Sequence, residues 1–352
     1  MPVSRCDVKS AILGACVGLL SFPVLADDWP LFRGPQQDGI SRESDFDPSG
    51  IPTVKWKAEV GLGYSAPVIS EGRLVIAGHA GGKDTLFCFD EASGDVKWEF
   101  SYPQPLGDLY FQGGTTGSAT LAGGFVYFVA REGETFCLKL EDGSIVWQKH
   151  LQTDFGFTKP TWGFSGAPLV RRDRVYLTAG ESGIALAAAD GSLIWKSDDE
   201  EAGYSTPFPI QRNGRDYLIF TNKRHYVCVE EENGTEVWKH RWMTRYGVNA
   251  ADPIVSDDHI LISSGYGKGA VLLNWDGNGN PDRVWQSREL RTQMNAAVRI
   301  GDYVYGVDGN ESQDGTGLKC LNWKTGETMW ANFNVGHGTV TAVGETLIVL
   351  TE

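Results

Sequence analysis

The sequence lacks the features that mark membrane-spanning and nucleic-acid-binding proteins. After residue 26, no apolar run approaches the roughly 20 residues that a helix needs to cross a bilayer. Basic residues are also scarce, because 31 Lys and Arg stand against 45 Asp and Glu, and the formal net charge is −14. A nucleic-acid binder needs a basic stripe to neutralise phosphates, so the composition argues against that class of partner.

Signatures of catalysis and metal binding are missing as well. The six histidines show no spacing of the His-Glu-X-X-His kind, which would bring two imidazoles to one metal ion. Apolar residues after residue 26 show no 3.6-residue period, so a helical fold is not expected. The sequence therefore favours a β protein and gives no positive sign of an enzyme.

Residues 1–26 have the composition of a secretion signal. Arg5 and Lys9 precede a short apolar stretch, and Ala26 supplies the small residue at the cleavage position. We expect export to the periplasm or cell envelope of a bacterium. The residues before Cys16 resemble a lipoprotein cleavage box, so a lipid anchor there is the alternative. Cleavage after Ala26 is favoured, because apolar residues continue past Cys16.

An internal repeat is the strongest signal in the sequence. Seven tryptophans recur at intervals of 42 to 49 residues: Trp56, Trp98, Trp147, Trp195, Trp238, Trp285 and Trp330. A glycine stands four residues before five of them: Gly94, Gly143, Gly191, Gly234 and Gly326. These glycines lie in turn sequences where a positive φ is needed, so each Trp is expected on the strand that leaves a hairpin.

Three further β-rich segments precede each tryptophan after Trp56. The first of the three often carries a proline, as in Pro67, Pro168, Pro207 and Pro253. Because proline lacks the amide donor of a sheet ladder, this segment is expected at a sheet edge, facing a central channel. Four short strands with their turns need about 40–45 residues, which matches the period. The sequence thus predicts an all-β, single-domain β-propeller of four-stranded antiparallel blades over residues 27–352.

The two ends of the repeat suggest how the ring closes. Residues 54–57, around Trp56, have no β-rich segments before them, so we expect them to be an outermost strand donated to the last blade. Six blades are complete, and a seventh begins at Gly338 and stops after Leu350. We therefore expect a C-terminally incomplete ring, which needs about 50–70 further residues for eight blades or a single strand for seven.

Four cysteines recur with the same period as the tryptophans. Cys88, Cys137, Cys228 and Cys320 each lie ten residues before a repeat tryptophan. Equivalent positions in different blades are too far apart for a disulfide, which requires Cα atoms within about 7 Å. We expect free thiols that fill small buried sites.

The Gly-X-X-X-Trp endings resemble the tryptophan-docking motif of pyrrolo-quinoline-quinone (PQQ) repeat propellers. The opening Trp29-Pro30-Leu31-Phe32-Arg33-Gly34-Pro35 is similar to the start of an exported bacterial subgroup with eight blades. The family includes quinoprotein alcohol dehydrogenases and the propeller lipoprotein of the outer-membrane β-barrel assembly machine. The resemblance implies that each docking tryptophan packs against a neighbouring blade.

The resemblance also raises the question of a cofactor. Quinoprotein dehydrogenases hold PQQ beside a Ca²⁺ ion on Glu, Asn and Asp, and many have a disulfide between adjacent cysteines. This sequence has no Cys-Cys pair and no such triad that a motif identifies, so no cofactor is expected; PQQ with Ca²⁺ is the alternative. A weak Ca²⁺ candidate is the loop with Asp276, Asn278, Asn280 and Asp282, but Pro281 replaces the required glycine, and an enlarged hairpin loop is favoured.

Binding residues are sought in the long loops that link one blade to the next. Aromatic residues with arginine are typical of protein-binding hot spots. The candidates are Tyr110, Phe111, Phe157, Trp162, Trp242, Arg245 and Tyr246. The alternative is that these rings only pack on neighbouring blades.

A second set of polar residues is expected to ring the central channel, which would hold a small ligand or, as we favour, water. They are Tyr64, Ser65, Ser118, Ser165, Ser205, Asn249, Asn295 and His337. The favoured function is a non-catalytic scaffold of the cell envelope that binds a protein or a small ligand. The alternatives are a PQQ-dependent dehydrogenase and a polysaccharide-binding propeller.

Overall fold

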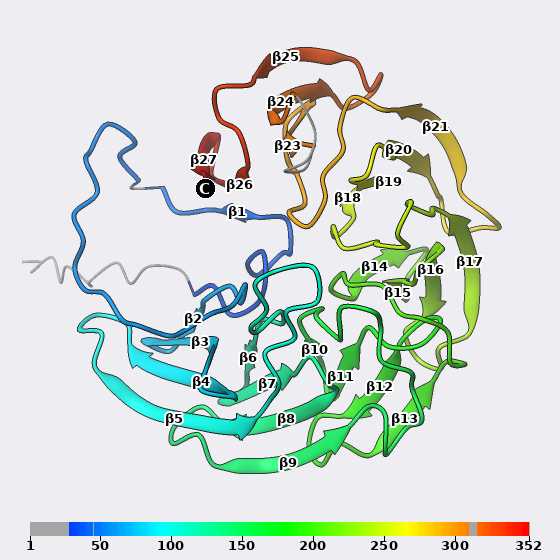
Figure 1. Cartoon of the computed structure of the whole chain (residues 1–352). Coiled ribbons are helices and arrows are strands. Elements are labelled where there is room, and N and C mark those ends of the chain that lie inside the picture. Colours follow the sequence, from blue (N-terminus) through cyan, green and yellow to red (C-terminus); the bar gives the residue numbers. More distant parts are fainter. Residues whose placement is uncertain (1–27, 45, 310–314, 352) are drawn as a thin grey trace, which may run out of the picture.

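Seven β-sheets surround a common centre in the computed structural model (Figure 1), which describes residues 28–44, 46–309 and 315–351. The first three sheets are β2 (Val68–Ser70), β3 (Arg73–Ala80), β4 (Lys83–Asp90) and β5 (Val96–Pro103); β6 (Thr120–Ala122), β7 (Phe125–Val129), β8 (Glu134–Lys139) and β9 (Ile145–His150); and β10 (Leu169–Arg171), β11 (Arg174–Leu177), β12 (Ile184–Ala187) and β13 (Leu193–Lys196). The next three are β14 (Phe208–Arg212), β15 (Arg215–Thr221), β16 (His225–Glu230) and β17 (Glu236–Arg241); β18 (Ile254–Ser256), β19 (His259–Ser264), β20 (Gly269–Asn274) and β21 (Asp282–Ser287); and β22 (Val298–Ile300), β23 (Tyr303–Asp308), β24 (Gly317–Asn322) and β25 (Thr328–Asn332). The seventh contains β1 (Ile40–Ser41), β26 (Gly338–Val343) and β27 (Thr346–Thr351).

Each of the first six sheets is antiparallel, with its strands in sequence order from the centre outward. The prolines lie where the sequence predicted: Pro168, Pro207 and Pro253 come directly before the innermost strands β10, β14 and β18. This arrangement confirms the all-β propeller. No helix among the described residues has the length and apolar character to cross a membrane. The predicted signal peptide and Cys16 lie outside the described residues.

The hydrophobic core is divided among the joints between consecutive sheets. Six clusters of buried side chains each bridge two neighbours, from the cluster of Val75 and Phe128 between the first two sheets to that of Val298 and Val340 between the last two. In the described part of the chain, no such cluster joins the seventh sheet to the first.

The tryptophans close these joints in the manner that the resemblance implied. The indole Nε1 atoms of Trp98, Trp147, Trp195 and Trp285 donate to the carbonyls of Leu140, Ala188, Glu231 and Trp323 in the next sheet, at 2.8 to 3.1 Å. The glycine three residues after each carbonyl lies under the indole ring. Two tryptophans differ. Trp238 packs on Trp275 with its Nε1 unpaired, and Trp330 is 43% exposed.

The N-terminal part of the domain lies in the middle of the ring (Figure 1). Trp29 pairs with Ile69 of the first sheet, and the Pro30 carbonyl accepts from Leu121 of the second. On the other side of the ring, β1 pairs in parallel with β26. Residues 29–41 therefore connect the innermost strands of the first and last sheets.

The predicted closing strand at residues 54–57 is wrong. These residues form no strand and pair with no part of the seventh sheet. An outermost strand needs a third strand beside it, and the described part of the seventh sheet ends with its second, β27. Trp56 still makes a docking contact with the first sheet, because its Nε1 donates to the Glu91 carbonyl and its ring covers Gly94.

The four described cysteines are free and buried, as predicted. Cys88, Cys137, Cys228 and Cys320 each pair across the ladder with the tryptophan of their own sheet. Burial raises the pKa of the Cys137 thiol to about 11, so this thiol is unreactive at neutral pH.

Candidate functional site: the crossover face

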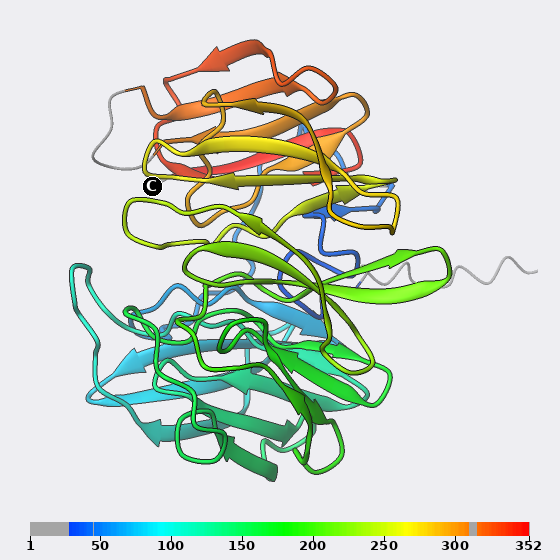
Figure 2. The ribbon, with the colours of Figure 1, turned by 90° about the vertical axis from the view of Figure 1, so that its right-hand side faces the viewer.

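The loops that link an outermost strand to the next innermost strand gather at one end of the molecule (Figure 2). We call this end the crossover face; its loops are residues 104–119, 151–168, 197–207, 242–253, 288–297 and 333–337. The turns between second and third strands lie at the same end, and the glycine hairpins lie at the opposite end.

Five of the seven predicted binding residues are accessible on the crossover face. Tyr110 is 86% exposed, Tyr246 is 50% exposed, Arg245 is also exposed, and Phe111 and Trp162 are partly exposed. The Arg245 guanidinium lies 5.3 Å from the centre of the Tyr246 ring, a cation–π contact that fixes both side chains.

The other two predicted binding residues, Phe157 and Trp242, are only 2% and 1% exposed, so the expectation that they contact a partner is wrong. Phe157 belongs to the apolar cluster between the second and third sheets. Trp242 belongs to the cluster between the fourth and fifth, and its Nε1 donates to the Ser264 hydroxyl. Both rings anchor their loops on the blades, which is the alternative that the sequence left open.

Six of the accessible aromatic residues occur in pairs that the sequence did not reveal. Ring centres are 5.8 Å apart for Tyr64 and Phe111, 5.9 Å for Trp162 and Tyr204, and 5.0 Å for Tyr246 and Tyr266. Each pair joins segments that are far apart in sequence. Exposed apolar side chains occur in the same loops and beside them: Leu62, Leu109, Met243 and Met294. The only feature of the sequence that pointed to these exposed side chains was their position in or next to long loops.

An acidic run ties two crossover loops together. The Asp199 carboxylate accepts from the Thr158 amide and hydroxyl at 2.8 and 2.7 Å. Glu201 accepts from the Thr161 hydroxyl at 2.7 Å and pairs with Lys223 at 2.6 Å. These contacts hold the Trp162 loop in place, which limits the entropy lost when the loop binds a partner.

The predicted channel residues mostly hold neighbouring blades together. The Ser118 hydroxyl accepts from the Ala66 amide, and Asn249 donates to the carbonyls of Asn222 and Trp242. Ser65, Ser165, Ser205 and Asn295 also have hydrogen-bond partners, Tyr64 is 57% exposed, and the buried His337 Nε2 has no partner among the described residues.

The channel itself differs from the expected water-filled space, because residues 29–41 enter it. Arg33 is buried and donates to the carbonyls of Gln37, Asp38 and Ala297. Asp252 is also buried; its Oδ1 accepts from the Thr206 amide, and its Oδ2 has no hydrogen bond in the described part of the chain. Burial raises the pKa of Asp252 to about 6, although the charge of Arg33 opposes the shift.

A buried His–Asp pair lies near the crossover face. His79 Nδ1 is 2.6 Å from Asp84 Oδ1, and the Tyr102 hydroxyl donates to Asp84 Oδ2 at 3.4 Å. Burial raises the pKa of Asp84 and of Tyr102. The Asp84 carboxylate thus links His79 of β3 to Tyr102 of β5.

The described residues give no positive support to a quinone with calcium. Within residues 28–44, 46–309 and 315–351, no three His, Cys, Asp or Glu side chains cluster as metal ligands would. Residues 29–41 occupy the centre of the ring, and the described cysteines lie in four different sheets. In the loop that was the weak calcium candidate, Asp276 Oδ1 accepts from the Asn278 amide at 2.9 Å, which makes a turn between β20 and β21.

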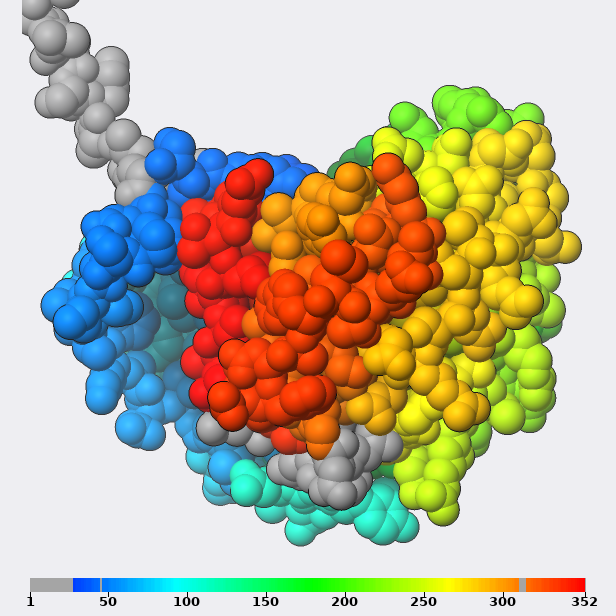
Figure 3. All heavy atoms as spheres, turned by 90° about the horizontal axis from the view of Figure 1, so that it is seen from above, coloured from blue at the N-terminus to red at the C-terminus, as the bar shows by residue number. Residues whose placement is uncertain are grey.

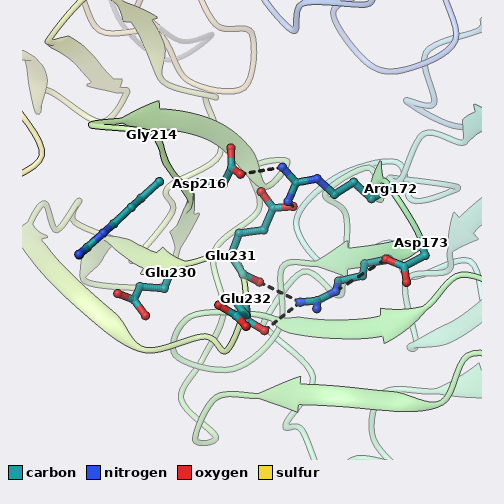
Figure 4. A pocket seen from close by; sticks show the side chains of 9 residues that line it. Arg172, Asp173, Gly214, Asp216, Glu230, Glu231 and Glu232 are labelled. Atoms are coloured by element: carbon teal, nitrogen blue, oxygen red, sulfur yellow. Dashed lines mark hydrogen bonds and ion pairs between the residues drawn. The ribbon is translucent and has the colours of Figure 1, made fainter.

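A charged pocket of about 510 Å³ lies at the opposite end of the molecule, between the third and fourth sheets (Figure 4). Arg172 pairs with Asp216 at 2.6 Å, and Arg174 donates to the Glu231 and Glu232 carbonyls. The Glu231 side chain accepts from the Tyr176 hydroxyl. These groups pair across the joint and stabilise the contact between the two sheets, although the buried Glu231 Oε2 accepts no hydrogen bond from the described residues.

Comparisons with known proteins support the fold. The chain superimposes on BamB from Moraxella catarrhalis with a TM-score of 0.58 at 17% identity, covering 82% of this chain and 79% of that one. A europium-containing methanol dehydrogenase gives 0.68 at 11% identity, covering 93% and 82%. At such identities the similarity establishes the propeller and nothing about activity.

The curated relatives found by sequence are also described as BamB. The outer membrane protein assembly factor BamB of Moranella endobia is 28% identical over 220 residues, 61% of this chain and 53% of that protein. That of Kangiella koreensis is 27% identical over 215 residues, 60% and 51%. The chain thus spans about half the length of the curated relatives it matches. A family model described as outer membrane protein assembly factor BamB matches residues 110–332, which is more than half of the chain, and the chain therefore belongs to that family.

Proposed function

We propose that this protein is a non-catalytic scaffold of the bacterial cell envelope that takes part in the assembly of outer membrane proteins. The crossover face is its binding surface. The observation that carries the proposal is the set of three aromatic pairs that lie in or beside the crossover loops and are at least partly exposed, with Arg245 beside one of them. Aromatic and arginine side chains on a rigid base are what protein-binding hot spots require.

The assembly role is supported by the family and by the relatives' names. Those relatives are described as outer membrane protein assembly factors, and this chain matches about half of their length. The envelope location agrees with the signal expected over residues 1–26. A dehydrogenase role has less support, because the likeness to a methanol dehydrogenase is at 11% identity and establishes the fold alone.

Site-specific crosslinking tests the proposal. A photo-reactive amino acid is placed at Tyr110 on the crossover face and, as the control, at Arg172 on the opposite face; both are exposed. We expect crosslinks from Tyr110 to proteins of the outer-membrane assembly machinery, identified by mass spectrometry. Trp162→Ala and Arg245→Ala should each lower the crosslinked yield at least several-fold without changing the melting temperature. Equal crosslinking from both faces, or unchanged yield in both variants, would contradict the proposal.

A further inference from the structure

Four positively charged side chains without acidic partners lie at the outer rim, where the fourth and fifth sheets meet. Arg241 ends β17, Arg283 lies in β21, and Arg288 follows β21 directly. Lys268 lies in the turn between β19 and β20. Among the described residues, no carboxylate comes within 4.0 Å of the charged nitrogens of these four side chains. Such a group is unexpected in a chain with 45 Asp and Glu against 31 Lys and Arg.

Contacts at the ends of these strands bring the cations together. The strands β17 and β21 follow one another along the rim (Figure 1), and Figure 3 shows the yellow atoms of the fifth sheet on the open surface. Lys268 Nζ lies 4.3 Å from the centre of the ring of Trp242, the residue after Arg241. A Cβ on Gly269, the residue after Lys268, would lie 2.8 Å from the Cα atom of Arg288. Lys268 therefore links the ends of the two strands.

The positive charges act on one another and on a histidine among them. Burial and the charges of Lys268 and Arg283 lower the pKa of His240. Burial and the charge of Arg241 lower the pKa of Lys268. Repulsion of this kind raises the free energy of the folded protein, and a negatively charged group bound among these side chains replaces it with attraction.

The strand β21 adds a hollow of about 450 Å³ with hydrogen-bond donors, lined by Arg283, Gln286, Ser287 and Arg288. Arg283 Nη1 donates to Gln286 Oε1 at 3.2 Å, which holds that guanidinium in place and leaves its other N–H groups to donate elsewhere. The Ser287 hydroxyl accepts from the Glu289 amide at 3.1 Å, so its own hydrogen can be donated as well. The described residues that line the hollow thus supply donors and positive charge and include no carboxylate.

A phosphate monoester matches this set of groups better than a carboxylate does. It carries about −1.5 to −2 charges at pH 7 and presents three acceptor oxygens, whereas a carboxylate carries one charge on two oxygens. The planar guanidinium of arginine binds two oxygens of such a group at once, and a lysine adds a point charge. We propose that Arg283, Arg288 and Lys268 bind the phosphate monoester of a lipid headgroup or of a small soluble molecule. No residue of the three aromatic pairs belongs to this site, and the inference does not depend on the proposed function.

Glycerol 3-phosphate is the soluble probe for this site, and glycerol is its control. The probe is titrated into the ¹⁵N-labelled protein at low ionic strength, because salt screens exposed charges. We expect saturable shifts in the amide resonances of Asp282–Ser287 and a higher pKa for His240, since the bound anion offsets the neighbouring positive charges. Arg283→Gln and Arg288→Gln should each weaken binding by a factor of about 5 or more, as the loss of a charged hydrogen bond does. Arg215→Gln, at an exposed arginine of the opposite end, should bind as the parent protein does.

Vesicles distinguish the two sources of the phosphate. Phosphatidic acid carries the same monoester on a lipid, so the protein is sedimented with phosphatidylcholine vesicles that do or do not contain it. Sedimentation that requires phosphatidic acid and is lost in Arg283→Gln and Arg288→Gln assigns a lipid headgroup. Binding of glycerol 3-phosphate without sedimentation assigns a soluble ester. Both side chains are exposed, so neither substitution should lower the melting temperature; if one does, the response of the parent protein to the probe and to glycerol still decides the question.

Glutarate tests the competing occupant, because its two carboxylates stand in for those of an acidic protein segment. Glutarate that binds as tightly as glycerol 3-phosphate would overturn the proposal in favour of such a segment. The proposal also fails if neither the soluble probe nor the lipid binds, or if the parent protein and both arginine variants bind equally well.

Discussion

Arg33 donates from Nη2 to the carbonyl of Ala297, 264 residues further along the chain, at a distance of 2.8 Å. The contact spans the centre of the ring, from the N-terminal segment to the residue that precedes β22. Arg33 also donates to Gln37 and Asp38, so one buried guanidinium fixes the turn of the segment and its attachment to the sixth sheet. Together with β1, this residue stabilises the arrangement of sheets through the centre.

We predict that Arg33→Met lowers the free energy of unfolding by about 3 kcal/mol, because it removes three hydrogen bonds, two of them buried, and leaves Asp252 without its nearby positive charge. Methionine keeps much of the packing of the arginine stem. Urea unfolding followed by circular dichroism measures the loss. Arg42→Met is the control, since that side chain is 52% exposed and pairs with Asp38 at the surface, where we expect a change of less than about 1 kcal/mol. Equal losses of stability in the two variants would show that the buried contacts of Arg33 do not stabilise the fold more than a surface ion pair does.

Asp252 should make stability depend on pH in a direction opposite to that of most carboxylates. Its pKa in the folded protein is about 6, above its ordinary value of 3.8, so the folded state holds the proton more tightly than the unfolded state. The contribution to stability is therefore fully present below about pH 4 and is lost as the pH rises through 6. The loss amounts to about 3 kcal/mol. Asp252→Asn should remove this dependence, which appears as the difference between the two unfolding curves measured from pH 4 to 8. An identical pH dependence in variant and parent would refute the assignment.

The docking joints give a test in which a single methyl group decides the outcome. Gly143→Ala places a Cβ 2.7 Å from the Trp98 ring at a φ of 72°, so the variant suffers both a clash and backbone strain. Gly123→Ala is the matched control, because its φ is 60° and nothing lies within 4 Å of the added Cβ. The control should lose about 1 kcal/mol from strain alone. We expect Gly143→Ala to lose roughly 2 kcal/mol more, as overpacking in a core does. Thermal unfolding that shifts equally in both variants would contradict the docking model.

The sequence was sufficient for the repeated parts of this fold. The glycine–tryptophan spacing located the hairpins, the prolines located the innermost strands, and the cysteines were correctly expected to be free. Each of these signals is local and occurs several times, so a chance match at one blade does not change the conclusion. Gly143 and Trp98 illustrate this: their contact follows directly from the period.

The parts that escaped prediction are single, long-range contacts. The strand β1 has only two residues and pairs in parallel with β26, which lies about 300 residues later, so no hydrophobic pattern announces it. Phe157 and Trp242 have the composition of a binding loop, yet both are buried because neighbouring sheets offer them apolar surface. Whether an aromatic side chain in a loop faces solvent depends on the surface of the adjacent blade. The residues of the loop itself carry no information about that surface.

The crossover face depends on the order of its loops, and Glu201 provides a test of that order. Glu201→Gln removes the charge that pairs with Lys223 and weakens the hydrogen bond from the Thr161 hydroxyl, so the loop that carries Trp162 should open more often. We expect faster amide hydrogen exchange at Trp162 and Gly163, by a factor of about 5, with little change in global stability.

Glu200→Gln is the control, because the ion pair of the half-buried Glu200 is longer, at 3.7 Å to the exposed Arg224. In the crosslinking assay, Glu201→Gln should also reduce the yield from Tyr110 less than Trp162→Ala does, since it loosens the loop without removing the ring. Unchanged exchange in the Glu201 variant would mean that the aromatic pair of Trp162 and Tyr204 holds the loop without help from the acidic run.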